Sequence, residues 1–526
     1  MLSKLKSSLS WQIGILIVAG FCFFLLGNNL YSLFDNSETH YSTVSREMAN
    51  TGDYLNLYFN GENWYVHPPL YFWLNSTIGK LAGWTDSNMR LLEGIFGILG
   101  VIATYFLGLR LLNREYAFIG ALILMSSTYY TLMSRLAIFD TLLNFFMIMN
   151  VFVFLKAYDE PKKKGLYFFL FSLFCTLSVL TKGPIGLLQP GIAIVAFLAW
   201  KRDLKFLLDW RVGLNFLVFL GITAPWYAHQ LYWHGWDFFN IALRDYTWYR
   251  FFGVVENQTG PWYYYFLILL TFLPWISYLP SVIYEWVRAR KINKGTNDTV
   301  LFFVLFIGLS FLFFSMAKTK LPNYIFSIFP FMSILIAYYF SKVKSTLSLL
   351  IPAGVLVVFS GVLVLYAKFG DIGQPYANER SIFILLFSIL SASSVVFFVT
   401  LYLKRIKLAI YLLTAGMLAF ILALATVGFP AFEKYKDSKA FVAILSKQEA
   451  PYQLMSYQVF SPYIMYYLNH HVQFAETLNE VKTMSQADPK PTFMIVYKWD
   501  LPAIQKTIPF TIVSTRTQQV LIEVKK

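Results

Sequence analysis

The chain has 526 residues, of which 57% are hydrophobic and only 13% are charged. Soluble domains carry about 25% charged residues, so this composition excludes an ordinary soluble protein and indicates a polytopic membrane protein. The formal charge of +15 comes from short basic clusters between apolar runs, which indicates membrane topology rather than nucleic-acid binding.

Apolar runs near 20 residues long predict about thirteen membrane-spanning helices. The first run covers residues 11–33 and follows a basic N-terminus, and we interpret it as a retained span rather than a signal peptide. The remaining predicted spans cover residues 90–111, 115–133, 136–155, 165–181, 184–200, 212–233, 262–286, 299–316, 323–341, 345–367, 381–403 and 408–430.

The basic clusters predict the orientation of these spans. With a cytoplasmic N-terminus, every inside loop carries Lys or Arg, as at residues 162–164 and 404–407. The outer face then receives the long loop at 34–88 and everything after Pro430. We therefore predict a transmembrane domain over residues 1–430, with any chemistry on the outside.

Polar and charged residues return in the C-terminal region, 431–526. Strand-like runs at 452–460, 492–498 and 511–524 alternate with helical patterns at 438–447, 461–469 and 478–486. This alternation predicts a small soluble α/β domain outside the membrane. The region has no glycine-rich phosphate loop, so we do not expect a nucleotide-binding domain.

The 34–88 loop concentrates acids, histidines and aromatic residues. Asp35 and Glu38 are one helical turn apart, so a helix would place both carboxylates on one face. His67 stands before Pro68-Pro69, which holds it at an extended break. An ordinary polar connector is the alternative, but loops of this length and aromatic content are usually functional.

Asp140 lies near the outer end of a predicted span, where an ionisable side chain is a functional candidate. The alternative is an ion pair with Arg135, although a spacing of five residues fits one helix face poorly. Basic and aromatic side chains on the outer face suit a phosphate or diphosphate, whereas headgroup snorkelling is the alternative for any single one. These side chains are Arg46, His67, Lys182, Arg244, Arg250, Lys318, Lys320 and Tyr324.

No strong metal-binding pattern occurs in the sequence. His229 and His234 are five residues apart, which does not match the four-residue spacing of a helical metal pair. Both cysteines, Cys22 and Cys175, lie in apolar runs and are interpreted as packing residues. The sequence therefore requires no cofactor.

Several motifs resemble those of the 4-amino-4-deoxy-L-arabinose (lipid A) transferases, in order along nearly the whole membrane region. They are Phe34-Asp35-Asn-Ser-Glu38-Thr-His-Tyr41 with Ser45-Arg46-Glu47-Met48, Pro225-Trp226, Tyr249-Arg250-Phe251, Pro261-Trp262-Tyr263-Tyr264, Leu273-Pro274-Trp275 and Lys320-Leu-Pro-Asn-Tyr324. The string from Val66 to Leu70, with His67-Pro68-Pro69, is more similar to the protein O-mannosyltransferases. Both groups are GT-C glycosyltransferases that use polyprenyl-phosphate sugars.

The resemblance implies a multi-pass enzyme of the bacterial inner membrane. Such an enzyme moves one sugar, by inversion in a single displacement, from undecaprenyl phosphate to lipid A or a related glycolipid on the periplasmic face. Protein hydroxyls are the alternative acceptor, and a transporter of lipid-linked sugars is a further alternative. Its partners are thus a lipid-linked donor, a glycolipid or protein acceptor and membrane lipid, without nucleic acid.

The resemblance also implies roles for individual residues. Asp35 and Asp140 match the catalytic acids, and Glu38 is the alternative to Asp35. Arg250 and Tyr324 match positions that hold the donor phosphate.

We add His67, Lys320 and Arg46 to this predicted phosphate site. The aminoarabinose enzymes have a Glu-Lys pair before the proline where this chain has Val66-His67. Because that Glu contributes to a metal site, metal binding here stays open.

Overall fold

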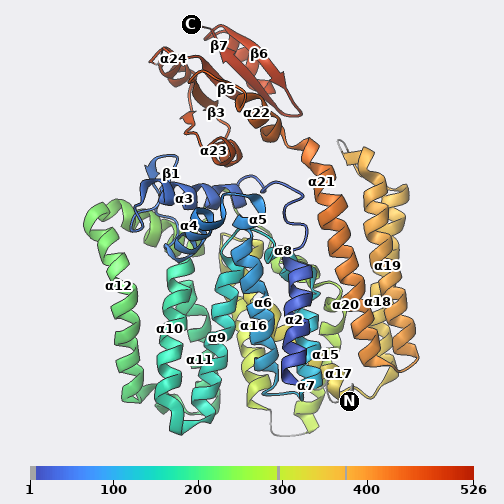
Figure 1. The fold of residues 1–526 in the computed structure, drawn as a ribbon. Coiled ribbons are helices and arrows are strands. Elements are labelled where there is room, and N and C mark those ends of the chain that lie inside the picture. The colour runs from blue at the N-terminus through green and yellow to red at the C-terminus, as the bar shows by residue number, and fades with distance from the viewer. Residues whose placement is uncertain (1–7, 293–296, 374–375, 488, 526) are drawn as a thin grey trace. The chain divides into compact units, whose positions relative to one another are not determined.

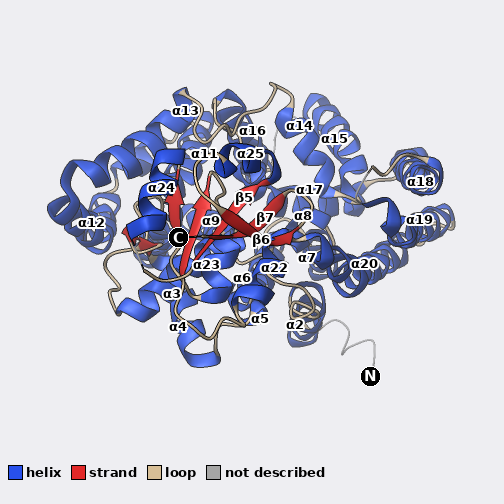
Figure 2. Cartoon of the chain, turned by 90° about the horizontal axis from the view of Figure 1, so that it is seen from above, coloured by secondary structure: helices blue, strands red, loops and turns tan. Residues whose placement is uncertain are grey.

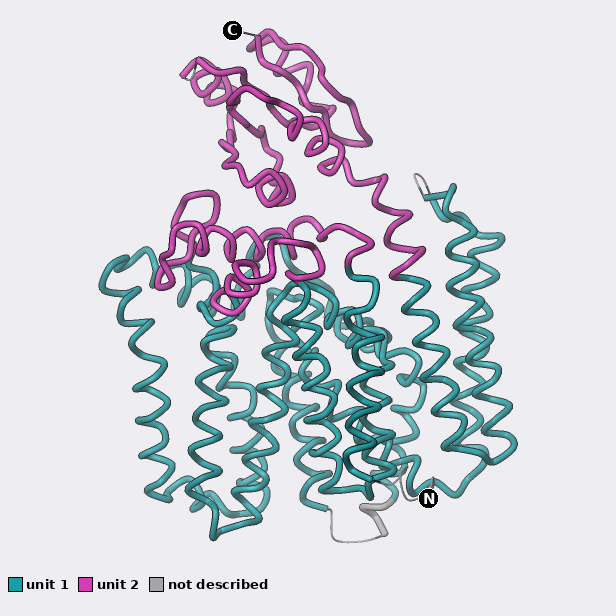
Figure 3. The backbone as a smooth tube through the Cα atoms, viewed as in Figure 1, with its two compact units in different colours: residues 1–28, 65–71, 90–424 teal, residues 29–64, 72–89, 425–526 magenta. Residues whose placement is uncertain are grey.

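The computed structural model describes residues 8–292, 297–373, 376–487 and 489–525. The basic N-terminus at 1–7 and loop residues 293–296 lie outside the described residues. The chain forms two compact units (Figure 3). Unit 1 comprises residues 1–28, 65–71 and 90–424, and unit 2 comprises residues 29–64, 72–89 and 425–526.

Unit 1 is built from long apolar helices (Figure 1). Within the described ranges, eight helices are long and apolar enough to cross a membrane, and a bent pair makes up to nine. The main helices are α2 (Leu9–Phe24), α6 (Leu91–Gly108), α7 (Arg114–Met125), α8 (Thr128–Met133), α9 (Asp140–Asp159), α10 (Lys164–Lys182), α11 (Ile185–Lys201), α12 (Trp210–Phe238), α13 (Arg250–Phe252), α14 (Tyr264–Leu269), α15 (Leu279–Ile292), α16 (Asp298–Met316), α17 (Phe329–Lys342), α18 (Thr346–Phe369), α19 (Arg380–Tyr402) and α20 (Ile406–Ala423). The chain is therefore a polytopic helical membrane protein, and the number thirteen stays a prediction.

Four predicted spans differ from the observed helices. The run at 11–33 is helical only over α2, which ends at Phe24. The run at 115–133 is divided into α7 and α8, and the run at 136–155 becomes helical only from Asp140. The run at 262–286 bends by 108° between Phe272 and Trp275, where Pro274 removes a backbone donor from the helix. Hydropathy identifies these apolar segments but does not determine where turns interrupt them.

Two fully buried arginines help to anchor the end of α2. Arg135 donates hydrogen bonds of 2.8 Å to the carbonyl oxygens of Phe23 and Leu26, and Arg90 donates one of 2.9 Å to that of Asn28. These carbonyls lie at the helix C-terminus, where backbone acceptors lack partners within the helix. Arg135 is thus engaged at α2.

Unit 2 contains a five-stranded mixed sheet in the order β4-β3-β5-β7-β6. Its strands β5, β6 and β7 are labelled in Figure 2. Strand β3 pairs in parallel with β4 and β5, whereas β7 pairs antiparallel with β5 and β6. The strands are β3 (Gln453–Tyr457), β4 (Gln473–Ala475), β5 (Thr492–Tyr497), β6 (Phe510–Thr515) and β7 (Gln519–Val524). Every residue of β3 is buried, as a central parallel strand requires.

Helices and a hairpin complete unit 2. They are α3 (Glu38–Thr51), β1 (Tyr58–Phe59), β2 (Glu62–Asn63), α5 (Asp86–Met89), α21 (Phe429–Phe432), α22 (Asp437–Leu445), α23 (Pro462–Leu468), α24 (Leu478–Ala487) and α25 (Leu501–Gln505). Helix α4 (Leu70–Ala82) contributes residues to both units. Most of the predicted outer loop therefore belongs to the same compact unit as the C-terminal region.

Candidate active site

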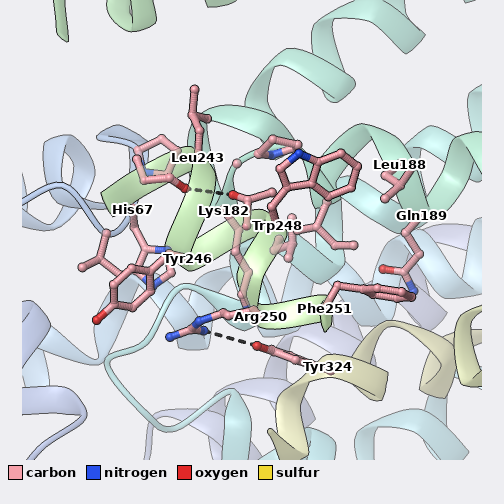
Figure 4. A pocket seen from close by; sticks show the side chains of 18 of the residues that line it. His67, Lys182, Leu188, Gln189, Leu243, Tyr246, Trp248, Arg250, Phe251 and Tyr324 are labelled. Atoms are coloured by element: carbon pink, nitrogen blue, oxygen red, sulfur yellow. Dashed lines mark hydrogen bonds between the residues drawn. The ribbon is translucent and has the colours of Figure 1, made fainter. Parts of the chain in front are cut away.

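Unit 1 contains a cavity of about 270 Å³ whose lining is mostly apolar (Figure 4). The lining comes from residues 65–68, the beginning of α9, the turn between α10 and α11, the end of α12 with the segment after it, and the region around 313–327. Segments distant in sequence thus converge on one cavity. Several of the polar side chains predicted from the sequence lie in its wall.

Asp140 is the first residue of α9 and is 3% exposed. Its carboxylate accepts hydrogen bonds from the Lys182 ammonium and, at 2.7 Å, from the Asn323 side-chain amide. A carboxylate at a helix N-terminus is further stabilised by the helix dipole. The partner of Asp140 is therefore Lys182, and the alternative pair with Arg135 is not formed.

The turn after α10 presents Lys182 to the cavity. Gly183 follows with φ of 78° and ψ of −160°, a combination that residues with a side chain strongly disfavour. Pro184 then precedes α11, and its fixed φ is well suited to the start of a helix. The Lys182 ammonium lies 5.1 Å from the ring centre of Phe139 and 5.8 Å from that of Tyr324. Aromatic faces and one carboxylate thus hold this buried cation.

Arg250 begins α13 directly after a π-helical segment, Phe239–Tyr249. It donates a hydrogen bond of 3.2 Å to the Tyr324 hydroxyl (Figure 4), and its guanidinium lies 4.5 Å from the ring centre of Tyr246. Backbone bonds from Thr319 to Arg250 and from Lys318 to Phe251, of 3.1 and 3.0 Å, join the two segments. This pairing explains how residues 74 positions apart meet.

Glu256 supplies a negative charge beside Arg250. Its carboxylate lies 3.7 Å from the guanidinium, and it also accepts hydrogen bonds from Tyr246 and Gln258. Because Glu256 is 47% exposed, water screens this pair. The positive charge of Arg250 is thus only partly neutralised by Glu256.

His67 also lines the cavity, and its ring centre lies 4.5 Å from that of Phe139. Lys320 does not line this cavity; its ammonium donates to the carbonyl oxygen of Ala317 at 2.5 Å. Burial, and to a smaller extent the nearby Lys318, lowers the pKa of Lys320.

Four residues of the lining carry buried polar atoms for which the described part of the chain offers no hydrogen-bond partner. They are Arg250 Nε, Asn323 Oδ1, Asn144 Oδ1 and the Tyr227 hydroxyl. Buried polar groups in proteins are nearly always paired, so each such group needs an explanation. Their gathering around one cavity indicates a place for a polar ligand.

The other predicted site residues belong to unit 2. Asp35 accepts hydrogen bonds from the backbone nitrogen of Tyr463 at 3.0 Å and from the Ser438 hydroxyl at 3.1 Å. Burial raises the pKa of Asp35, and these hydrogen bonds offset part of that effect. Glu38 is buried, and its carboxylate accepts the backbone nitrogen of Phe34 at 2.9 Å.

Arg46 donates to the carbonyl oxygen of Tyr466 at 2.9 Å, and its guanidinium lies over the rings of Trp84 and Tyr466. The predicted residues therefore do not form one cluster. Asp140, His67, Arg250 and Tyr324 line the cavity of unit 1, Lys320 lies in unit 1 outside that lining, and Asp35, Glu38 and Arg46 belong to unit 2.

Local sequence patterns do not single out Lys182 and do not indicate Asn323, although both side chains contact Asp140. Lys182 is one of eight basic or aromatic candidates on the predicted outer face. Its position before Gly-Pro at the end of a predicted span is the feature that distinguishes it from the others. Asn323 lies inside the Lys-Leu-Pro-Asn-Tyr motif that drew attention to Tyr324. Asn144 is one helical turn after Asp140 and therefore faces the same cavity.

The described residues do not fit a metal centre. They contain no group of three or more His, Cys, Asp or Glu side chains placed to hold a metal ion. Val66, at the position where the resembled enzymes carry a metal-binding Glu, has no ligand atom in its side chain.

Comparison with known proteins identifies similar sequences and a similar fold. Residues 15–239 match the family model of dolichyl-phosphate-mannose-protein mannosyltransferases. An uncharacterised protein of Aquifex aeolicus is 30% identical over 62% of this chain and 73% of its own length.

The undecaprenyl phosphate-alpha-4-amino-4-deoxy-L-arabinose arabinosyl transferase of Shewanella sediminis is 30% identical over 57% of this chain. The match spans only 55% of that enzyme's length.

The fold matches a solved structure over nearly its whole length. ArnT from Cupriavidus metallidurans, solved with undecaprenyl phosphate bound, superposes with a TM-score of 0.81 at 19% identity and covers 98% of both chains. Together with the sequence relatives, this similarity in fold places the chain among the GT-C glycosyltransferases.

Proposed function

We propose that this protein transfers a single sugar from undecaprenyl phosphate to lipid A or a related glycolipid on the periplasmic face of the inner membrane. The observation that carries the proposal is the unit 1 cavity. There the cations Lys182 and Arg250, and four buried polar atoms without a partner among the described residues, interrupt an apolar wall. A lipid phosphate bearing a sugar has the complementary chemistry. Arg250 can bind the phosphate, and the side-chain amides of Asn144 and Asn323 can bind the sugar hydroxyls. The aromatic wall can pack against the prenyl chain.

Arg250, Tyr324 and His67 are proposed to hold the donor phosphate. The guanidinium offers several fixed donors, and a charge-assisted bond to phosphate is about twice as strong as a neutral one. During transfer the bond between the anomeric carbon and the phosphate oxygen breaks, and negative charge builds on that oxygen. A positive group held in place stabilises this charge without first having to reorganise.

Asp35 is proposed to orient the acceptor and to take its proton when the nucleophile is a hydroxyl. The acceptor oxygen then bonds to the anomeric carbon as the phosphate leaves, so one displacement inverts that centre. Asp140 holds Lys182 in the cavity and thereby keeps a second cation in place. We also propose thirteen spans, a cytoplasmic N-terminus and an α/β domain at 431–526 in the periplasm.

A protein acceptor is the second candidate. The family model that matches residues 15–239 describes protein mannosyltransferases, and the His67-Pro68-Pro69 string resembles them. A hydroxyl of Ser or Thr would then attack the same donor. The catalytic groups of the chain would keep their roles.

Mass spectrometry of lipid A from cells with and without the gene tests the proposal. We expect loss of one sugar-sized mass, restored by the parent gene but not by Asp35→Asn or Arg250→Gln at equal membrane levels. Unchanged lipid A together with a lost sugar on a protein would select the second candidate. Unchanged lipid A and unchanged glycoproteins would overturn both.

A further inference from the structure

The carboxylate of Asp35 is enclosed by groups from the C-terminal part of unit 2. Its Oδ1 atom accepts the backbone nitrogens of Tyr463 and Asn36, each at 3.0 Å. Its Oδ2 atom accepts the hydroxyl of Ser438 at 3.1 Å. Both oxygens are therefore directed by residues that lie more than 400 positions along the chain.

Ser438 is itself fixed in place. It is 6% exposed, lies in the first turn of α22, and shares a hydrogen bond of 3.1 Å with Ser461, which directly precedes α23. A buried hydroxyl with two defined neighbours has little freedom to turn away. Its hydrogen is donated to the Asp35 carboxylate, which can only accept, and the Ser461 hydroxyl then donates to Ser438.

The chain before Asp35 is attached to the same region. Lys436 donates to the Ser32 hydroxyl at 2.8 Å and to the Leu33 carbonyl oxygen at 3.2 Å. The Leu33 nitrogen donates to the Tyr467 hydroxyl at 2.8 Å. The backbone just before Asp35 thus has little room to shift without breaking these contacts.

We infer that Ser438 is a positioning residue, which together with the backbone of Tyr463 sets the orientation and the charge state of Asp35. The inference rests on the proposed role of Asp35. It gives the C-terminal region a role in function, because removal of one hydroxyl there would alter the carboxylate that is proposed to activate the acceptor.

The groups that face Asp35 determine the direction of the expected effect. Burial disfavours the carboxylate, whereas the two backbone nitrogens, the Ser438 hydroxyl and the positive charge of Lys436 favour it. Lys436 is neutralised in turn by Glu433 at 2.6 Å. Without the Ser438 hydroxyl, the same burial remains with one donor fewer, so protonation of Asp35 becomes easier.

The test follows the protonation of Asp35 in the purified full-length protein without any substrate. Infrared carboxyl bands are recorded over a pH series, and the difference between the parent and Asp35→Asn isolates the band of Asp35. We expect Ser438→Ala to raise its midpoint by about one pH unit, a tenfold change in proton affinity, as loss of a hydrogen bond to a charged group implies. Ser438→Thr, which keeps the hydroxyl, should restore the parent midpoint.

Ser446→Ala is the matched control, because Ser446 lies just after α22 and is exposed. Should Ser438→Ala not fold, Ser438→Cys gives a similar volume with a weaker donor and should shift the midpoint in the same direction. Superimposable titrations of the parent and the Ser438 variant that folds would overturn the inference. Sugar transfer by Asp35→Asn at the parent rate would instead overturn the proposed role of Asp35, so the two failures are distinguishable.

Discussion

Replacing Lys182 with methionine removes the positive member of the buried pair with Asp140 while keeping most of the side-chain volume. The Lys182 side chain is 12% exposed and that of Asp140 is 4% exposed, so the remaining carboxylate is shielded from water. Leaving one charge of a buried pair alone costs about 3–5 kcal/mol. Asn323 keeps its 2.7 Å hydrogen bond to Asp140, so we expect the lower end, a loss of about 3 kcal/mol in the free energy of unfolding.

Reversible unfolding in mixed micelles measures this loss. Asp140→Asn combined with Lys182→Met removes both charges, so the double variant should recover most of the stability. Lys201→Met is the control, because Lys201 pairs with Asp298 where the two side chains are 32% and 44% exposed. Such a surface pair contributes about 0–1 kcal/mol. Equal losses for the two lysine variants, or no coupling between positions 182 and 140, would refute the reasoning.

Three further predictions concern the turn, the phosphate site and pH. Gly183→Ala should lower the free energy of unfolding by about 1–3 kcal/mol, because alanine disfavours the positive φ of this position. Gly191→Ala is the control and should not destabilise the protein, because Gly191 lies inside α11 with open space around it. Arg250→Gln should weaken undecaprenyl phosphate binding about 10- to 100-fold in a titration, unlike Arg244→Gln, whose parent arginine is exposed and pairs with its neighbour. Burial lowers the pKa of His40 from 6.5 to about 4, so its contribution to stability is present above pH 6.5 and is lost as pH falls toward 4. Unfolding curves should show about 2 kcal/mol less stability at pH 5 than at pH 7 from this group, and His40→Gln should abolish that part.

The sequence alone determined the class of the protein and much of its local structure. Long apolar runs separated by basic clusters require a membrane environment, because no soluble core could bury them. Acids and prolines in the first loop marked Asp35 and His67, and the isolated carboxylate at the end of an apolar run marked Asp140. In the C-terminal region, local patterns located α22, α23, α24 and β5 to within a few residues. Each of these signals comes from residues that are near one another in the chain.

Tertiary structure decided which side chains meet. Asp140 pairs with Lys182 rather than Arg135, because Arg135 donates to the carbonyls at the end of α2. Arg250 contacts Tyr324 because backbone hydrogen bonds join residues 250–251 to residues 318–319, and no local sequence pattern predicts this pairing.

Strand β4 escaped prediction, because its three residues are too few for a periodic signal. Asp35 receives hydrogen bonds from Ser438 and Tyr463, so its environment depends on a region that its own motif does not contain. Hydrogen bonds and ion pairs act between neighbours in space, and only the folded chain determines which residues those neighbours are.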